Sequence, residues 1–97
     1  MMTTVEMKDV LFKKIREEGS CFTKSEISIV KTRRGYDVTI KGYEHSRFHI
    51  IEENDEYFGH MLWIRTDDEI IDMFDSKKEF MYKTALIYIG YYIGTRF

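Results

Sequence analysis

The chain of 97 residues has one cysteine, Cys21, and no proline. A lone cysteine cannot form an internal disulfide, whereas small domains of oxidising compartments usually carry several bridged cysteines. Charge also precedes any apolar run at the N-terminus, which argues against a secretory leader, so we expect a cytoplasmic protein. Without proline, repeats or low-complexity tracts, no stretch has the composition of a linker, and residues 1–97 are expected to form a single domain.

Long hydrophobic runs are missing as well. The most apolar stretch is residues 85–93, whereas a helix needs about 20 apolar residues to cross a bilayer. This stretch is therefore expected to be a buried element of a protein that does not enter membranes. Hydrophobic residues make up 43% of the chain and charged residues 33%, which suits a soluble domain with its own core.

The motifs of common enzymes are also absent. There is no phosphate-binding glycine loop, no histidine and glutamate pair of zinc proteases, and no Gly-x-Ser-x-Gly turn. The imidazoles that could pair with the Cys21 thiol in a catalytic site are those of His45, His49 and His60, but nothing in their spacing places any of them near Cys21. On a strand, His45 and His49 would lie about 13 Å apart, too far to share one metal ion. We expect a protein that is not an enzyme and has no catalytic residue, metal or cofactor.

The N-terminal segment carries the signals of an amphipathic helix. Thr3 stands three residues before Glu6, the arrangement in which a hydroxyl and a carboxylate satisfy the free amides of a helix start. Apolar residues follow at helical spacing, and Gly19 supplies the flexible residue that often ends a helix. The pattern predicts a helix over residues 4–18.

After residue 26 the apolar period changes to two, which is typical of half-buried strands. The alternating positions are Ile27 and Ile29, then Tyr36, Val38 and Ile40, then Phe48 and Ile50. Glycines in residues 33–35 and 41–43 predict tight turns between these strands, and residues 53–56 are a third turn candidate. Residues 57–65 are predicted to be a fourth strand, although a helix also fits them.

Two more hydroxyl and glutamate pairs follow, Thr66 with Glu69 and Ser76 with Glu79. They predict a short helix over residues 67–74 and a longer one over 77–93. Residues 86–93 are rich in β-branched and aromatic side chains, so a terminal strand is the competing interpretation of that segment. The whole pattern predicts an α+β fold. Its parts are an N-terminal helix, an antiparallel meander of three to four strands, and one or two C-terminal helices packed on the sheet.

Gly90 and Gly94 are spaced to lie on one side of a helix, where they would let another backbone approach closely. We expect them to pack on the sheet of this domain. In the alternative, the glycines face outward, and Tyr88, Tyr91 and Tyr92 would be anchors for an oligomer or a partner, since tyrosine is enriched at interface centres.

Charge is segregated along the chain. Residues 52–75 have Arg65 as their one base among many acids, whereas residues 31–49 are mostly basic in their charged positions. Such blocks create local fields that select partners, although on a small domain they are often only solvated faces. The acidic segment would suit a basic site on another macromolecule.

A basic and aromatic sheet face is the alternative. Positions 43, 45, 47 and 49 share one parity and would project from the face opposite Phe48 and Ile50. With Trp63, Met61 and Tyr57 they could form a surface on which single-stranded RNA bases stack. The acidic net charge of −2 and the lack of an RNA-binding signature argue against it. The residues of this alternative face are Lys41, Tyr43, His45, Arg47 and His49.

In style, the chain resembles the small accessory proteins of tailed bacteriophages, which act in host takeover or against host defences. The resemblance is one of composition: similar length, no proline, many Lys, Ile, Tyr, Phe and Met residues, and acids concentrated in one segment. It implies stoichiometric binding to a host or defence-system protein in the cytoplasm of the host cell.

The leading hypothesis is therefore a non-catalytic inhibitor or modulator that binds a protein through an acidic and aromatic surface, with nucleic acid as the alternative partner and a homo-oligomer as a further option. Acids steer association, and aromatic side chains anchor it. The acids are Glu52, Glu53, Asp55, Glu56, Asp67, Asp68, Asp72 and Asp75. The anchors are Tyr57, Trp63, Tyr91 and Tyr92.

Overall fold

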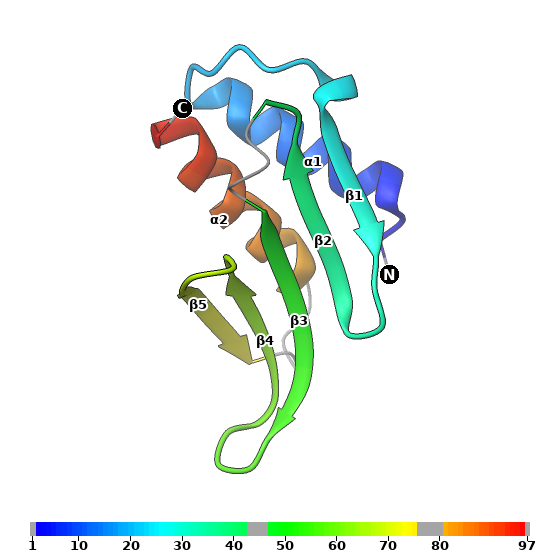
Figure 1. Cartoon of the computed structure of the whole chain (residues 1–97), viewed down its shortest axis with the longest axis vertical. Coiled ribbons are helices and arrows are strands. Elements are labelled where there is room, and N and C mark those ends of the chain that lie inside the picture. Colours follow the sequence, from blue (N-terminus) through cyan, green and yellow to red (C-terminus); the bar gives the residue numbers. More distant parts are fainter. Residues whose placement is uncertain (1, 43–46, 76–80, 97) are drawn as a thin grey trace.

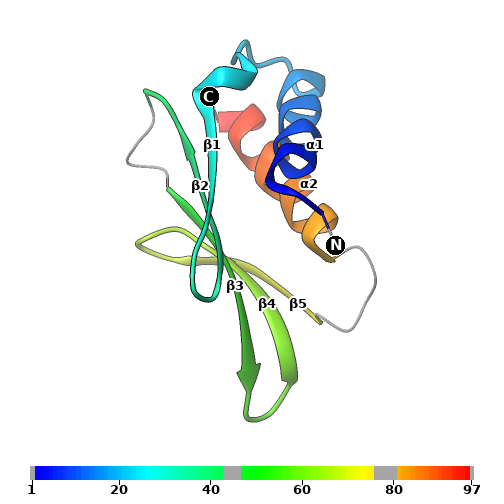
Figure 2. The ribbon, with the colours of Figure 1, turned by 90° about the vertical axis from the view of Figure 1, so that its right-hand side faces the viewer.

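The structure is a computed structural model that describes residues 2–42, 47–75 and 81–96. Its elements in chain order are α1 (Thr4–Glu17), the short 3₁₀ helix η1 (Lys24–Glu26), β1 (Ile27–Lys31), β2 (Gly35–Ile40), β3 (Phe48–Asp55), β4 (Gly59–Arg65), β5 (Ile70–Asp75) and α2 (Met81–Arg96). The strands form one antiparallel sheet in the order β1-β2-β3-β4-β5. Both helices lie on the same face of this sheet (Figures 1 and 2). The predicted α+β fold is confirmed, and within the described residues the meander has five strands and is followed by one C-terminal helix.

Helix α1 forms as its sequence predicts. The Thr3 hydroxyl accepts a hydrogen bond from the Glu6 amide at 3.1 Å, and the Glu6 carboxylate accepts one from the Thr3 amide at 3.4 Å. The buried stripe is Met7, Leu11 and Ile15. After the helix, Gly19 has φ of +92°, a conformation that glycine adopts without strain.

The core lies between the inner face of the sheet and the two helices. Alternate strand residues point inward, so the period of two in the sequence becomes one buried layer. The buried sheet residues are Ile27, Tyr36, Val38, Ile40, Phe48, Ile50, Leu62 and Ile64. They face Met7, Leu11 and Ile15 of α1 and Met81, Ala85, Leu86, Ile89 and Ile93 of α2.

The predicted helix over residues 67–74 is wrong, because this segment forms the β4–β5 turn and strand β5. The Thr66 hydroxyl does accept hydrogen bonds from the Asp68 and Glu69 amides, at 3.3 and 3.2 Å. The same short-range bonds that cap a helix also close a turn, and here the Thr66 amide bonds to the Glu69 carbonyl. Pairing with the edge of β4 then decides in favour of a strand.

Two boundaries also differ from those expected. The predicted turn at residues 53–56 is displaced, since β3 continues to Asp55 and the turn occupies residues 56–58. Residues 86–93 belong to α2, so the terminal strand is excluded. The predicted cap at Ser76 and Glu79 lies outside the described residues.

The two glycines of α2 face α1 and not the sheet, which corrects the expected packing. A Cβ atom added to Gly90 would lie 2.7 Å from the Lys14 Cβ, and one added to Gly94 would lie 2.4 Å from the Glu18 Cβ. The Ser20 hydroxyl also donates to the Gly94 carbonyl at 3.2 Å. The missing side chains therefore let the two helices touch. Among the described residues, no helix is long and apolar enough to cross a membrane.

Candidate functional site

The hairpin of β3 and β4 extends past the ends of both helices (Figures 1 and 2). Its turn carries Tyr57 and Phe58, whose relative exposures are 88% and 62%. Single exposed apolar residues are common, but here two adjacent aromatic side chains of a projecting turn are left mostly uncovered by the described part of the chain. We call residues 55–59 the hairpin tip.

The hairpin tip is an ordered turn. One oxygen of the Asp55 carboxylate accepts hydrogen bonds from the amides of Tyr57 and Phe58, at 2.8 and 3.0 Å. Gly59 then turns the chain back with φ of +79°. Aspartate and glycine are both favoured in turns, and the four-residue spacing of Asp55 and Gly59 is the sequence signal that would place the turn between them and bring Phe58 into it.

The base of the hairpin is tied to α2. The Tyr82 hydroxyl donates to the Glu52 carboxylate at 2.5 Å, and His60 Nε2 lies 3.4 Å from the other Glu52 oxygen. Burial of the phenol raises the pKa of Tyr82, and the neighbouring Glu52 carboxylate raises it further. Glu52 is therefore on the helix side of the sheet and is engaged within the protein.

The predicted acids do not form one patch, because consecutive strand residues project from opposite faces. Glu53 lies on the outer face, 3.6 Å from Arg34. Asp55 closes the hairpin turn, and Asp72 accepts a hydrogen bond from the next amide along the chain. Glu56 and Asp68 are exposed, whereas the side chain of Asp75 lies outside the described part of the structure.

His49 lies on the outer face between two carboxylates. Its Nδ1 is 2.7 Å from Asp37 and its Nε2 is 2.7 Å from Asp67, so it links β2 and β3 to the β4–β5 turn. Burial lowers the pKa of His49, but hydrogen bonds to Asp67 and Asp37 and the charges of both raise it, and the net shift is upward. The hydrogen bond from His49 lowers the pKa of Asp67.

These contacts weaken the case for the alternative nucleic-acid face. Lys41 and Arg47 are exposed, but His49 is held between acids that would repel a phosphate backbone. Tyr43 and His45 lie outside the described residues. No group of three metal-binding side chains occurs among the residues that are described.

The four predicted anchors lie in different surroundings. Tyr57 is at the hairpin tip and Tyr91 is exposed on α2. Tyr92 packs edge-on against Phe48 with ring centroids 5.5 Å apart, and the Arg96 guanidinium lies 3.6 Å from its ring centre, so it has an internal role.

Trp63, the remaining anchor, is half-buried on the outer face of the sheet. It stands between Ile51 and Met73 on the neighbouring strands, and Gly35 lies beyond Ile51 in the same row. Its indole nitrogen is buried and has no hydrogen-bond partner among the described residues. Trp63 thus contributes to a small apolar row, and it lies well back from the hairpin tip.

Comparison with known proteins gives no relative: no family model, no curated protein and no solved structure matches the chain. Function is therefore inferred from the geometry of the molecule. The feature that internal packing explains least is the hairpin tip, with two exposed aromatic rings on an ordered, projecting turn.

Proposed function

We propose that this chain is a non-catalytic binding protein that engages a partner protein through the hairpin tip. The observation that carries the proposal is the exposure of Tyr57 and Phe58 on a turn that projects beyond the body of the domain (Figure 2). Water-exposed aromatic rings gain the most when a partner buries them, and tyrosine is among the residues that dominate interface energies.

The order of the turn supports the same conclusion. Binding costs free energy when flexible segments must be fixed, and a preorganised turn reduces that cost. The Asp55 carboxylate already fixes the amides of Tyr57 and Phe58, and the Tyr82 to Glu52 hydrogen bond holds the hairpin against α2. The aromatic rings are thus presented on a scaffold that is set before the partner arrives.

The charge around the tip indicates the chemistry of the partner. Glu56 is exposed within the turn, and Glu53 lies on the adjoining strand. A partner that fits this surface has an apolar pocket for the two rings and basic residues at its rim, since complementary charge speeds association and selects partners. Together with the resemblance to phage accessory proteins, this supports stoichiometric inhibition of a host or defence-system protein.

The proposal is tested by photo-crosslinking from the tip. A benzophenone amino acid is placed at Tyr57, and the same group at Val5, which is exposed on α1, is the control. The two proteins are incubated with lysate of the native host, irradiated and analysed by mass spectrometry, with and without nuclease. We expect one dominant protein crosslink from position 57, independent of nuclease and absent from position 5.

Substitution of the tip gives the matching loss. Tyr57→Ser with Phe58→Ser should abolish capture of that protein while the unfolding temperature stays that of the wild type, because both side chains are exposed. Equal crosslinking from both positions would contradict the proposal. A crosslink to RNA that disappears with nuclease would favour the nucleic-acid alternative.

A further inference from the structure

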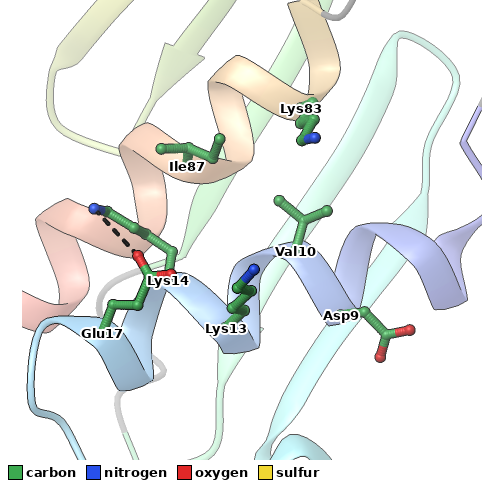
Figure 3. A pocket seen from close by; sticks show the side chains of 7 residues that line it. All are labelled: Asp9, Val10, Lys13, Lys14, Glu17, Lys83 and Ile87. Carbon is green, nitrogen blue, oxygen red and sulfur yellow. Dashed lines mark ion pairs between the residues drawn. The ribbon is translucent and has the colours of Figure 1, made fainter.

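The charged side chains of this chain form two kinds of contact. On helix α1, Lys14 lies 3.7 Å from Glu17, three residues further along the same helix (Figure 3). Such exposed pairs contribute little to stability. On the outer face of the sheet, the imidazole of His49 joins two carboxylates from separate elements, Asp37 of β2 and Asp67 of the β4–β5 turn. We call these three side chains the His49 clamp.

The His49 clamp requires two protons on the ring. An ionised carboxylate only accepts hydrogen bonds, whereas a neutral imidazole donates from one ring nitrogen and accepts at the other. Each ring nitrogen of His49 lies 2.7 Å from a carboxylate oxygen. Both contacts are hydrogen bonds only when both nitrogens are protonated and the ring is positively charged. Loss of one proton leaves a lone pair facing a negative oxygen, so one of the two contacts becomes repulsive.

The two carboxylates differ in how firmly the fold holds them. Asp37 is in the middle of β2, paired with Val30 on one side and with His49 on the other, and its side chain is 32% exposed. Asp67 is in a turn, and its side chain is 63% exposed. Water can solvate the Asp67 carboxylate as soon as it separates from the ring. The contact to Asp67 is therefore the one that a neutral His49 loses.

The charged groups that face the clamp are of both signs. Among the described residues, β2 contributes Asp37, β4 contributes Arg65, the turn contributes Asp67 and Arg47 precedes β3, whereas the facing positions of β1 and β5, Val30 and Ile70, are uncharged. The hydrogen bond from His49 lowers the pKa of Asp67, and the charges of Arg47 and Arg65 lower it further. Asp67 therefore stays ionised while His49 titrates, and either arginine can attract it after release.

We propose that the His49 clamp is a pH-dependent switch that docks the β4–β5 turn on the sheet when the ring is charged and releases it when the ring is neutral. Burial lowers the pKa of His49, but the hydrogen bonds to Asp67 and Asp37 and their charges raise it more, above its ordinary value of about 6.5. Docking is therefore complete below that pH and is lost as pH rises through the folded-state pKa. The clamp does not include the hairpin tip, so this inference is independent of the proposed function.

Nuclear magnetic resonance of the isotope-labelled chain tests the switch. The ring of His49 should carry two protons at low pH and one above the transition. The Thr66 and Glu69 amides bond within the turn, to the Glu69 carbonyl and the Thr66 hydroxyl. Their protection from hydrogen exchange, corrected for the intrinsic effect of pH, should fall about tenfold with the same midpoint, as the loss of one hydrogen bond predicts. A singly protonated ring at low pH, or protection that is constant through the transition, would overturn the proposal.

Amide substitutions in the turn distinguish a switch from a merely structural contact. Asp67→Asn replaces a group that only accepts by one that also donates, so either form of the ring can hold the turn, and protection should no longer depend on pH. Asp68→Asn is the matched control, because Asp68 is an exposed acid of the same turn that makes no hydrogen bond to His49. It should leave the midpoint and the size of the change as in the wild type. A pH dependence that survives Asp67→Asn, or that Asp68→Asn removes, would refute the switch.

Discussion

Gly94→Ala is a substitution for which two physical effects predict opposite signs. Alanine is favoured over glycine inside a helix by about 1 kcal/mol, so helix propensity alone predicts stabilisation. In the structure, however, the new methyl carbon would lie 2.4 Å from the Glu18 Cβ and 3.1 Å from its Cγ. The backbone fixes the position of the Glu18 Cβ, so no rotamer change relieves the contact at 2.4 Å.

The size of the effect follows from the separation that the methyl group requires. Carbon atoms are in favourable contact at about 3.5 Å, so α2 must move about 1 Å from α1. Overpacking of this kind costs about 1–3 kcal/mol, and we take about 2–3 because the clash is between atoms close to both backbones. After the helix propensity is subtracted, Gly94→Ala should lower the free energy of unfolding by about 1–2 kcal/mol.

Urea denaturation followed by circular dichroism measures this difference. Lys83→Ala, at an exposed position of the same helix, is the control and should change stability by less than about 0.5 kcal/mol. In a Glu18→Gly background the clashing carbons are gone, and Gly94→Ala should then become neutral or stabilising. A gain of about 1 kcal/mol from Gly94→Ala in the wild-type background would refute the close packing of the two helices.

Two further predictions concern the outer face and the hairpin tip. The pKa of His49 is raised above its ordinary value of about 6.5. The stability that the charged His49 contributes is therefore complete below that pH and is lost as pH rises through the folded-state pKa. The free energy of unfolding, measured across this pH range, should fall for the wild type and stay flatter for His49→Gln. Asp55→Ala removes the acceptor of two amide hydrogen bonds, so it should lower the free energy of unfolding by about 1–2 kcal/mol and speed hydrogen exchange at the Tyr57 and Phe58 amides. Asp55→Asn keeps an acceptor and should change both quantities much less.

The elements with a clear period could be predicted from the sequence. The capping pair of Thr3 and Glu6 and the apolar residues at helical spacing locate α1 to within one residue, and the alternation from Ile27 to Ile50 gives three strands. These signals are local: each depends on hydrogen bonds or side-chain directions within a few residues.

The failures occur where a local signal fits two structures. Thr66 and Glu69 make the hydrogen bonds of a helix cap, but the same bonds close a hairpin, and only pairing with β4 distinguishes the two. Likewise, the glycine spacing of α2 correctly predicts a close backbone approach but does not say whether the sheet or α1 provides it. Such choices depend on tertiary contacts that the short window does not contain.

The sequence predicts only part of the candidate site, because the rest also depends on tertiary contacts. The sequence predicts Tyr57 as an aromatic anchor within the acidic segment, but the length by which the hairpin passes the helices depends on the whole fold (Figure 2). The acids that are adjacent in sequence, such as Glu52 and Glu53, separate to opposite faces of β3. Density of charge along a chain is therefore a poor guide to density on a surface when the segment is a strand.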